Sequence, residues 1–107
     1  MKGFDAPLGN MMKQAQELQK KMAQVQADLR TRVVEDSAGG GMVTAQVNGQ
    51  RELVALKIDP EVVDPDDVEM LQDLVIAAVS QALKKAEKLA ETEMAKVTGG
   101  LSLPGMF

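Results

Sequence analysis

The chain has 107 residues, which is the length of a single domain, and its net charge is -4. It contains no cysteine and no histidine, so it lacks a disulfide framework, thiolate ligands, and the commonest metal ligand and general base. Aromatic residues make up only 2% of the chain, and leucine, valine, alanine and methionine must therefore supply the core. We expect no catalytic residue, no metal site, no cofactor and no small-molecule substrate.

Apolar and charged residues are distributed along the chain in a way that suits no membrane segment. No stretch reaches the roughly 18 consecutive apolar residues that a span requires, and the first residues lack the apolar core of a signal peptide. We therefore expect a cytoplasmic protein without a membrane partner.

The charge is unevenly distributed along the chain: residues 1–32 carry +3, residues 33–73 carry -8 and residues 74–107 carry +1. A basic first segment precedes an acidic middle.

The first predicted element is a helix over about residues 10–31, for which Asn10 suits the capping position. Apolar residues recur there at alternating steps of three and four, which is the a/d pattern of a heptad seam. The seam comprises Leu8, Met11, Ala15, Leu18, Met22, Val25 and Leu29. The sequence leaves open whether this seam pairs within the chain, with a second copy or with an unrelated helix.

Three strands are expected next, because the apolar period changes from 3.5 to two. They lie at about residues 31–36, 42–48 and 51–58. Asn48-Gly49 favours a tight hairpin turn with positive backbone angles, so the last two strands should pair antiparallel. The third strand presents on one face Val54, Leu56 and Ile58. The glycines at 39–41 join two strands and precede no helix, so we interpret them as a flexible loop and not as a phosphate cradle.

A second long helix is predicted over about residues 65–97. Asp64 suits its cap, Pro65 its first turn, and the acids that follow favour the positive end of the helix dipole. The acidic run lacks the glycine and the final bidentate acid of a calcium loop, so capping and a solvated turn explain it better. Residues 98–107 are expected to form a flexible tail.

The predicted order is α-β-β-β-α, a single α+β domain over residues 1–107 with a three-stranded antiparallel sheet and two long helices. The second helix would be roughly 45 Å long at 1.5 Å per residue, which is too long for so short a sheet to cover. Its outer half, and much of the first helix, therefore need a partner for their apolar stripes. A second copy of the chain is the simplest partner, and the predicted seam and dimer residues are Met11, Leu18, Met22, Val25, Leu29, Val54 and Leu56.

Basic residues on both helices are the candidate nucleic-acid contacts. On charge alone a solvated face is the favoured interpretation, with Lys84 and Lys88 paired to Glu87 and Glu91 at short helical distances. No aromatic ring flanks the basic residues, so a nucleic-acid partner would be a duplex held mainly through its phosphates. The candidate DNA contacts, chosen by charge and helical facing, are Lys13, Lys20, Lys21, Arg30, Lys84, Lys85 and Lys88.

Several short motifs occur together in a fixed order. They include Asn10 to Gln16, Gly39 to Val43, Val47-Asn48-Gly49, Ile58 to Glu61, Glu69 to Leu74 and Thr98-Gly99-Gly100. On these motifs the chain resembles the YbaB/EbfC nucleoid-associated family over essentially its full length. The resemblance implies an intertwined homodimer in which a shared sheet supports long helices that project like the arms of tweezers. It also implies duplex DNA binding in the nucleoid, DNA protection and an influence on gene expression, without enzymatic activity.

Two other functions remain open at this point. The main alternative is a coiled-coil and sheet interaction module that associates with DNA-metabolism proteins without touching DNA, and salt-sensitive duplex binding separates the two. An enzyme is a distant third, because the chain lacks histidine and cysteine and its acids cluster at helix starts and turns.

Overall fold

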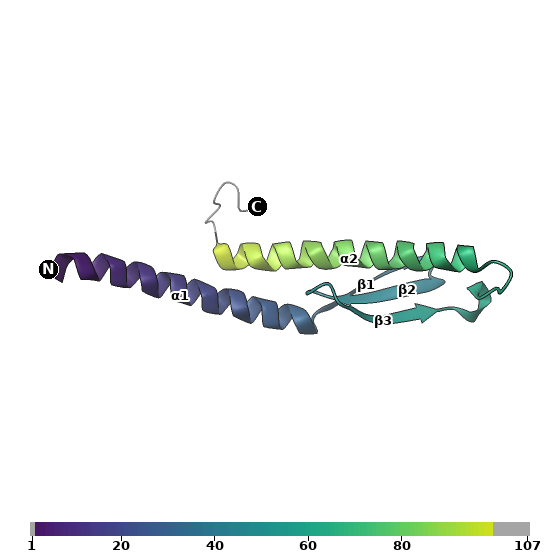
Figure 1. The fold of residues 1–107 in the computed structure, drawn as a ribbon, viewed down its shortest axis with the longest axis horizontal. Coiled ribbons are helices and arrows are strands. Elements are labelled where there is room, and N and C mark those ends of the chain that lie inside the picture. Colours follow the sequence, from purple (N-terminus) through teal and green to yellow (C-terminus); the bar gives the residue numbers. More distant parts are fainter. Residues whose placement is uncertain (1, 100–107) are drawn as a thin grey trace.

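Two long helices and a short sheet form an elongated molecule that measures 79 × 25 × 16 Å (Figure 1). The computed structural model describes residues 2–99, with side chains described for residues 8–99. The elements are α1 (Lys2–Thr31), β1 (Val33–Ala38), β2 (Val43–Asn48), β3 (Leu53–Ile58), the short 3₁₀ helix η1 (Pro60–Val62) and α2 (Val68–Thr98). The predicted α-β-β-β-α order is confirmed. Neither helix, as far as these residues go, is long and apolar enough to cross a membrane.

The core lies between one face of the sheet and α2. The strands are antiparallel in the order β1-β2-β3, and the central strand contributes Val43, Ala45 and Val47, none of which is exposed. Facing them, α2 presents a fully buried stripe of alanines at every fourth position, Ala78, Ala82 and Ala86. Small side chains let the helix lie close to the sheet. Because α2 runs along β1 and β2, the outer strand β3 is left largely uncovered.

The pairing of β3 corrects the predicted face of that strand. Val43 pairs with Ile58, Ala45 with Leu56 and Val47 with Leu53, and residues paired directly share a face of the sheet. A bulge opposite Gln46 and Val47 makes Val54 the extra residue. Since one inserted residue breaks the alternation, Leu53 takes the place predicted for Val54 beside Leu56 and Ile58. All three apolar side chains remain between about a third and a half exposed.

The start of α1 differs from the prediction, whereas its end at Thr31 agrees with it. The helix begins at Lys2, so Asn10 lies inside it and is not a cap. Phe4 lies four residues before Leu8, and the apolar spacing therefore already extended upstream of the predicted start. At the other end the helix runs through Thr31, where the Arg32 amide donates to the Leu29 carbonyl at 3.2 Å. As a result β1 begins two residues later than expected.

The start of α2 also differs, by three residues. Its cap is Asp67, whose carboxylate accepts from the Met70 amide at 3.2 Å. Asp64 heads a separate turn, in which its side chain accepts from the Asp66 amide and its carbonyl from the Asp67 amide. The residue type predicted for the cap was right, but Asp64 takes part in the turn, and the later aspartate Asp67 caps the helix instead. At the far end α2 continues to Thr98 and stops at Gly99, which is left-handed; the rest of the predicted tail lies outside the described residues.

The turn between β2 and β3 works differently from the predicted hairpin. The positive φ belongs to Arg51, at 64°, and not to Gly49. The nearly buried side chain of Asn48 organises the turn by accepting from the amides of Gln50 and Glu52, both at 3.0 Å. Gly49 is needed for space, because a Cβ atom there would lie 2.8 Å from the carbonyl oxygen of Leu29. The turn thus supports the end of α1, and β3 begins only at Leu53.

Candidate nucleic-acid interface

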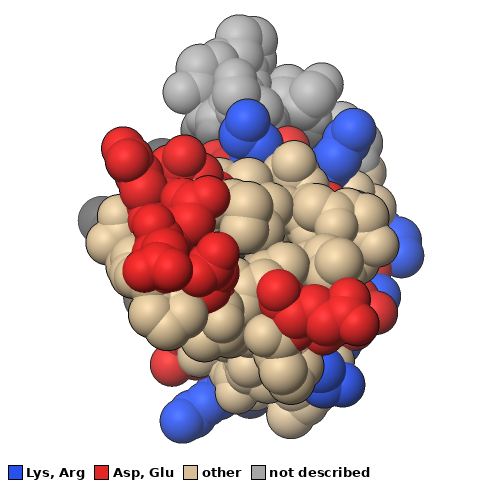
Figure 2. Space-filling model, turned by 90° about the vertical axis from the view of Figure 1, so that its right-hand side faces the viewer, with Lys and Arg blue, Asp and Glu red and all other residues tan. Residues whose placement is uncertain are grey.

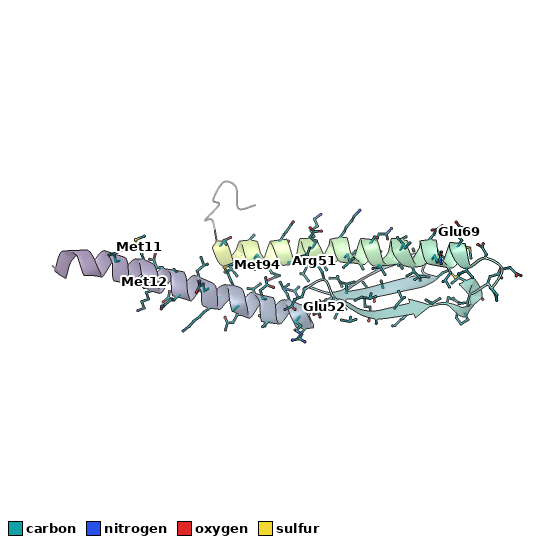
Figure 3. The ribbon with its side chains drawn as sticks, viewed as in Figure 1. Met11, Met12, Arg51, Glu52, Glu69 and Met94 are labelled. Carbon is teal, nitrogen blue, oxygen red and sulfur yellow. The ribbon has the colours of Figure 1, made fainter. Side chains whose placement is uncertain are left out.

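Only the inner half of the predicted seam on α1 is covered by the chain itself. Leu29 is buried, and the preceding seam residues Leu18, Met22 and Val25 are half-buried. Met22 lines a groove with Met94 of α2, which Figure 3 shows between the two helices. Met11, in contrast, is 64% exposed on the part of α1 that projects past α2. One chain therefore covers the inner seam and leaves the outer part of α1 projecting. We call residues 8–30 of α1 the arm.

The angle between this arm and α2 is held by a small ion-pair cluster. The guanidinium of Arg32 lies 2.8 Å from the Glu93 carboxylate, and Lys96 lies 3.2 Å from the same oxygen. Hydrogen bonds from Arg32 and then from Lys96 lower the pKa of Glu93 below its ordinary value. None of these three residues was among the predicted site residues. No local sequence pattern indicates the pair of Arg32 and Glu93, because the two residues lie 61 positions apart.

The four predicted contacts on α1 all project into solvent. Lys13, Lys20, Lys21 and Arg30 are exposed, and within the described side chains none of them forms an ion pair. Lys13 and Lys20 are seven residues apart and lie on one side of the helix. The arm therefore offers a row of basic groups with no acidic partner fixed beside them.

The predicted contacts on α2 divide into two groups. Lys85 is engaged within the chain: its ammonium donates to the Glu35 carbonyl of β1 at 3.0 Å and lies 3.7 Å from the Asp36 carboxylate. Lys84 and Lys88 are exposed, and their expected pairing with nearby glutamates is not formed. The structure thus leaves two of the three lysines open to a ligand.

The acidic residues gather at the opposite end of the molecule from the arm. Figure 2, which views that end, shows red groups around tan surface. We define the acidic tip as residues 59–73, a segment with seven acids and no lysine or arginine. No group of three or more acidic side chains there or elsewhere among the described residues is arranged to hold a metal ion. The sequence placed the acids in the middle of the chain, but only the fold separates them from the basic arm.

Comparison with known proteins connects this geometry to a family. The YbaB/EbfC DNA-binding family matches residues 5–101. The chain belongs to this family. A nucleoid-associated protein of Thermoanaerobacter pseudethanolicus is 55% identical over 105 residues, which cover 98% of this chain and 93% of that protein. A nucleoid-associated protein of Ruminiclostridium cellulolyticum is 54% identical over 98% of this chain and 92% of its own length.

The fold of this YbaB/EbfC family member recurs in a solved structure. The crystal structure of an uncharacterized protein from Helicobacter pylori superposes with a TM-score of 0.72 at 26% identity, over 86% of this chain and 94% of the other. The family and the predicted α-β-β-β-α fold with its three-stranded antiparallel sheet are therefore both confirmed, whereas the homodimer stays a prediction. The individual DNA contacts and the dimer residues stay predictions.

Proposed function

We propose that this YbaB/EbfC family member is a nucleoid-associated protein that binds duplex DNA as a homodimer, mainly through the basic residues of α1. The observation that carries the proposal is the row of exposed, unpaired basic side chains along α1, which leads away from the acidic tip toward the opposite end of the molecule. Separation of the two charges along the molecule lets an acidic protein present a positive surface to DNA. The DNA-binding description of the family agrees with this polarity.

Contacts to phosphates suit this surface better than contacts to base edges. Lysine ammonium groups on flexible stems bind phosphates as point charges, and the arm carries three of them at Lys13, Lys20 and Lys21. Arg30 extends the row toward the sheet, and Lys84 and Lys88 add exposed charge on α2. Lys85 should contribute least, since its ammonium already serves β1. Such binding would be strongly salt-dependent.

The open edge of β3 supports association with a second copy. The other outer strand, β1, carries Glu35 and Asp36 and has a main-chain carbonyl occupied by Lys85, which are ordinary protections of a sheet edge. β3 carries only one charged residue, Lys57, and among the described residues no side chain occupies a main-chain carbonyl of β3. It also exposes apolar side chains, among them the predicted dimer residues Val54 and Leu56. We therefore place the dimer contact at β3, where pairing would produce a shared sheet.

The nucleoid role follows from the relatives, which are named nucleoid-associated proteins. Organisation of the nucleoid, protection of DNA and regulation of gene expression are consequences of a small dimer that coats duplex DNA, and they require no enzymatic activity. An interaction module without DNA binding is disfavoured, because the matched family is a DNA-binding one.

A duplex titration tests the DNA contact. Anisotropy of a labelled duplex would be followed at several salt concentrations for the parent, for Lys20→Glu and for the matched control Arg51→Glu, which makes the same charge change at an exposed residue of the turn before β3. We expect Lys20→Glu to weaken binding and to reduce the salt slope by about 0.9 for each phosphate that the variant no longer neutralises, with little change in the control. Equal effects in the two variants would show that net charge and not the arm determines affinity. No binding by the parent at low salt would refute DNA binding.

Sedimentation tests the dimer contact separately. Leu56→Asp places a charge on the open face of β3 and should convert the dimer to a monomer. Val33→Asp makes the same kind of change at a more exposed apolar residue of β1 and should leave the dimer intact. A parent that sediments as a monomer, or dissociation only in the β1 variant, would overturn this assignment.

A further inference from the structure

The acidic tip carries exposed apolar side chains as well as charge. Val68 is 51% exposed on α2 and Val63 is 54% exposed in the preceding loop, and Ile76, three residues beyond the tip on α2, is 63% exposed. Glu69, Asp73 and Ile76 follow one another at steps of four and three, so they form one stripe on the helix. Beside them lies a shallow hollow of about 370 Å³, lined by Asp67, Glu69, Met70, Asp73 and Leu74. Figure 2 shows this end of the molecule, where tan surface separates two red groups.

Local structure accounts for only part of this surface. Asp59, Asp64 and Asp67 accept main-chain hydrogen bonds in turns and caps. Asp73 has no such bond, lies beyond the first turn of α2 and has no ion-pair partner among the described side chains. Helix capping also does not explain why large apolar side chains lie exposed beside Asp73. An apolar surface with an acidic rim fits a partner that is both apolar and basic.

The chain itself contains such a surface at its other end. We define the distal arm as residues 8–13 of α1. Leu8, Met11 and Met12 are between 59% and 64% exposed there, and the exposed Lys13 follows them. Methionine side chains adapt to irregular apolar surfaces, and a lysine stem can lie across an apolar floor while its ammonium reaches a carboxylate. The distal arm therefore has the chemistry that the tip requires.

These two surfaces cannot meet within one chain. They lie at opposite ends of a molecule whose longest dimension is 79 Å (Figure 1). A contact between them must join two molecules, and it uses a different patch on each. Contacts of this heterologous kind extend into rows unless the rotation happens to close a ring.

We propose that the acidic tip of one molecule binds the distal arm of a second copy, so that molecules associate head to tail. The occupant of the tip is thus the amino-terminal part of α1, held by Leu8, Met11 and Met12 against the exposed apolar side chains of the tip and by Lys13 at the acidic rim. This association goes beyond the proposed DNA binding and does not require DNA. Lys20 and Lys21, further along the arm, remain free for phosphates.

Sedimentation velocity without DNA tests the proposal. The parent would be measured over a concentration series at about 0.05 M and about 0.5 M salt, because the higher ionic strength screens surface charges over a few ångströms. The tip variant is Glu69→Lys with Asp73→Lys, and the arm variant is Met12→Glu with Lys13→Glu. The matched control is Glu87→Lys with Glu91→Lys, which makes the same charge change as the tip variant on an exposed part of α2 outside the tip.

We expect species larger than the basal unit to grow with parent concentration at low salt and to disappear at high salt. Each variant alone should associate at least tenfold more weakly, while the control behaves as the parent. The equal mixture of tip and arm variants should associate again, because each supplies the surface that the other lacks. Thermal melting identifies a variant that is unfolded, and the neutral pair Glu69→Gln with Asp73→Asn then replaces the tip variant.

Three results would overturn the proposal: no species above the basal unit for the parent at low salt, parent-like association of a folded tip variant, or a mixture that stays apart. Because no DNA is present, each of these results leaves the proposed DNA binding untouched. A failed duplex titration would likewise leave the head-to-tail contact standing.

Discussion

Substitution of Gly49 by alanine tests how α1 is attached to the sheet. An added Cβ atom would lie 2.6 Å from Cδ2, 2.8 Å from Cβ and 2.8 Å from the carbonyl oxygen of Leu29. The first atom can rotate away, but the other two move only with the backbone of α1. The same carbonyl accepts the Gly49 amide at 2.8 Å, so a displaced helix also weakens that hydrogen bond.

Overpacking of this kind costs about 1–3 kcal/mol, and a weakened hydrogen bond adds about 1 kcal/mol. We therefore expect Gly49→Ala to lower the free energy of unfolding by about 2–4 kcal/mol, which corresponds to roughly 10–25 °C in Tm for a domain of this size. Circular dichroism melting at one fixed protein concentration measures it, since dimer dissociation makes Tm depend on concentration.

The same substitution at two other glycines provides controls. Gly9 has open space in the middle of α1, so Gly9→Ala should raise stability by about 0.5–1 kcal/mol. Gly40 also has open space but a φ of +67°, so Gly40→Ala should show only backbone strain, about 1 kcal/mol. Gly49→Asn decides the reason for the glycine: an asparagine less harmful than alanine would show that a left-handed backbone, and not space, is required there, and the reasoning would be refuted.

Contacts of α2 give three further predictions. Because hydrogen bonds from Arg32 and Lys96 lower the folded-state pKa of Glu93, this carboxylate stabilises the fold above its unfolded pKa, and the contribution is lost as the pH falls through the folded value. Over the acidic range, Tm should therefore fall more steeply with decreasing pH for the parent than for Glu93→Gln. Parallel plots of Tm against pH would contradict a stabilising ion-pair cluster at Glu93. Ala82→Leu should lose about 1–3 kcal/mol by overpacking between helix and sheet, measured by denaturant unfolding against the exposed control Ser80→Leu. Asp67→Ala should cost about 1 kcal/mol because the helix cap is removed, and Asp66→Ala much less; equal losses would mean that Asp67 caps nothing.

The order and type of the elements were readable from the sequence because apolar periods of 3.5 and two replace each other cleanly along it. Their limits were less readable, since local chemistry offers several valid choices. Four consecutive residues from Asp64 onward suit a helix start. Asp67 becomes the helix cap only because Asp64 takes part in a separate turn. The bulge at Val54 shifts one face of β3 without any glycine or proline to signal it.

Tertiary contacts determined which candidate residues are open to a ligand. Lys84, Lys85 and Lys88 were all candidates by their charge, yet Lys85 alone reaches β1. Gly49 was correctly expected in a turn, but its role depends on Leu29, twenty positions earlier. The distance between the acidic tip and the basic arm follows from α1 and α2 overlapping along only part of their lengths, which no local pattern encodes.

The hydrogen bond from Lys85 to β1 limits how many copies of the chain can join into one sheet. A sheet grows only where both of its outer strands accept another strand, and here Lys85 occupies a carbonyl on one of them. If two copies pair through β3, each copy uses its open edge in the contact, and the protected strand β1 of each copy forms an outer edge of the joined sheet. Strand addition then ends at six strands, twice the three of one chain, so a protein with an apolar edge is kept from growing into fibrils.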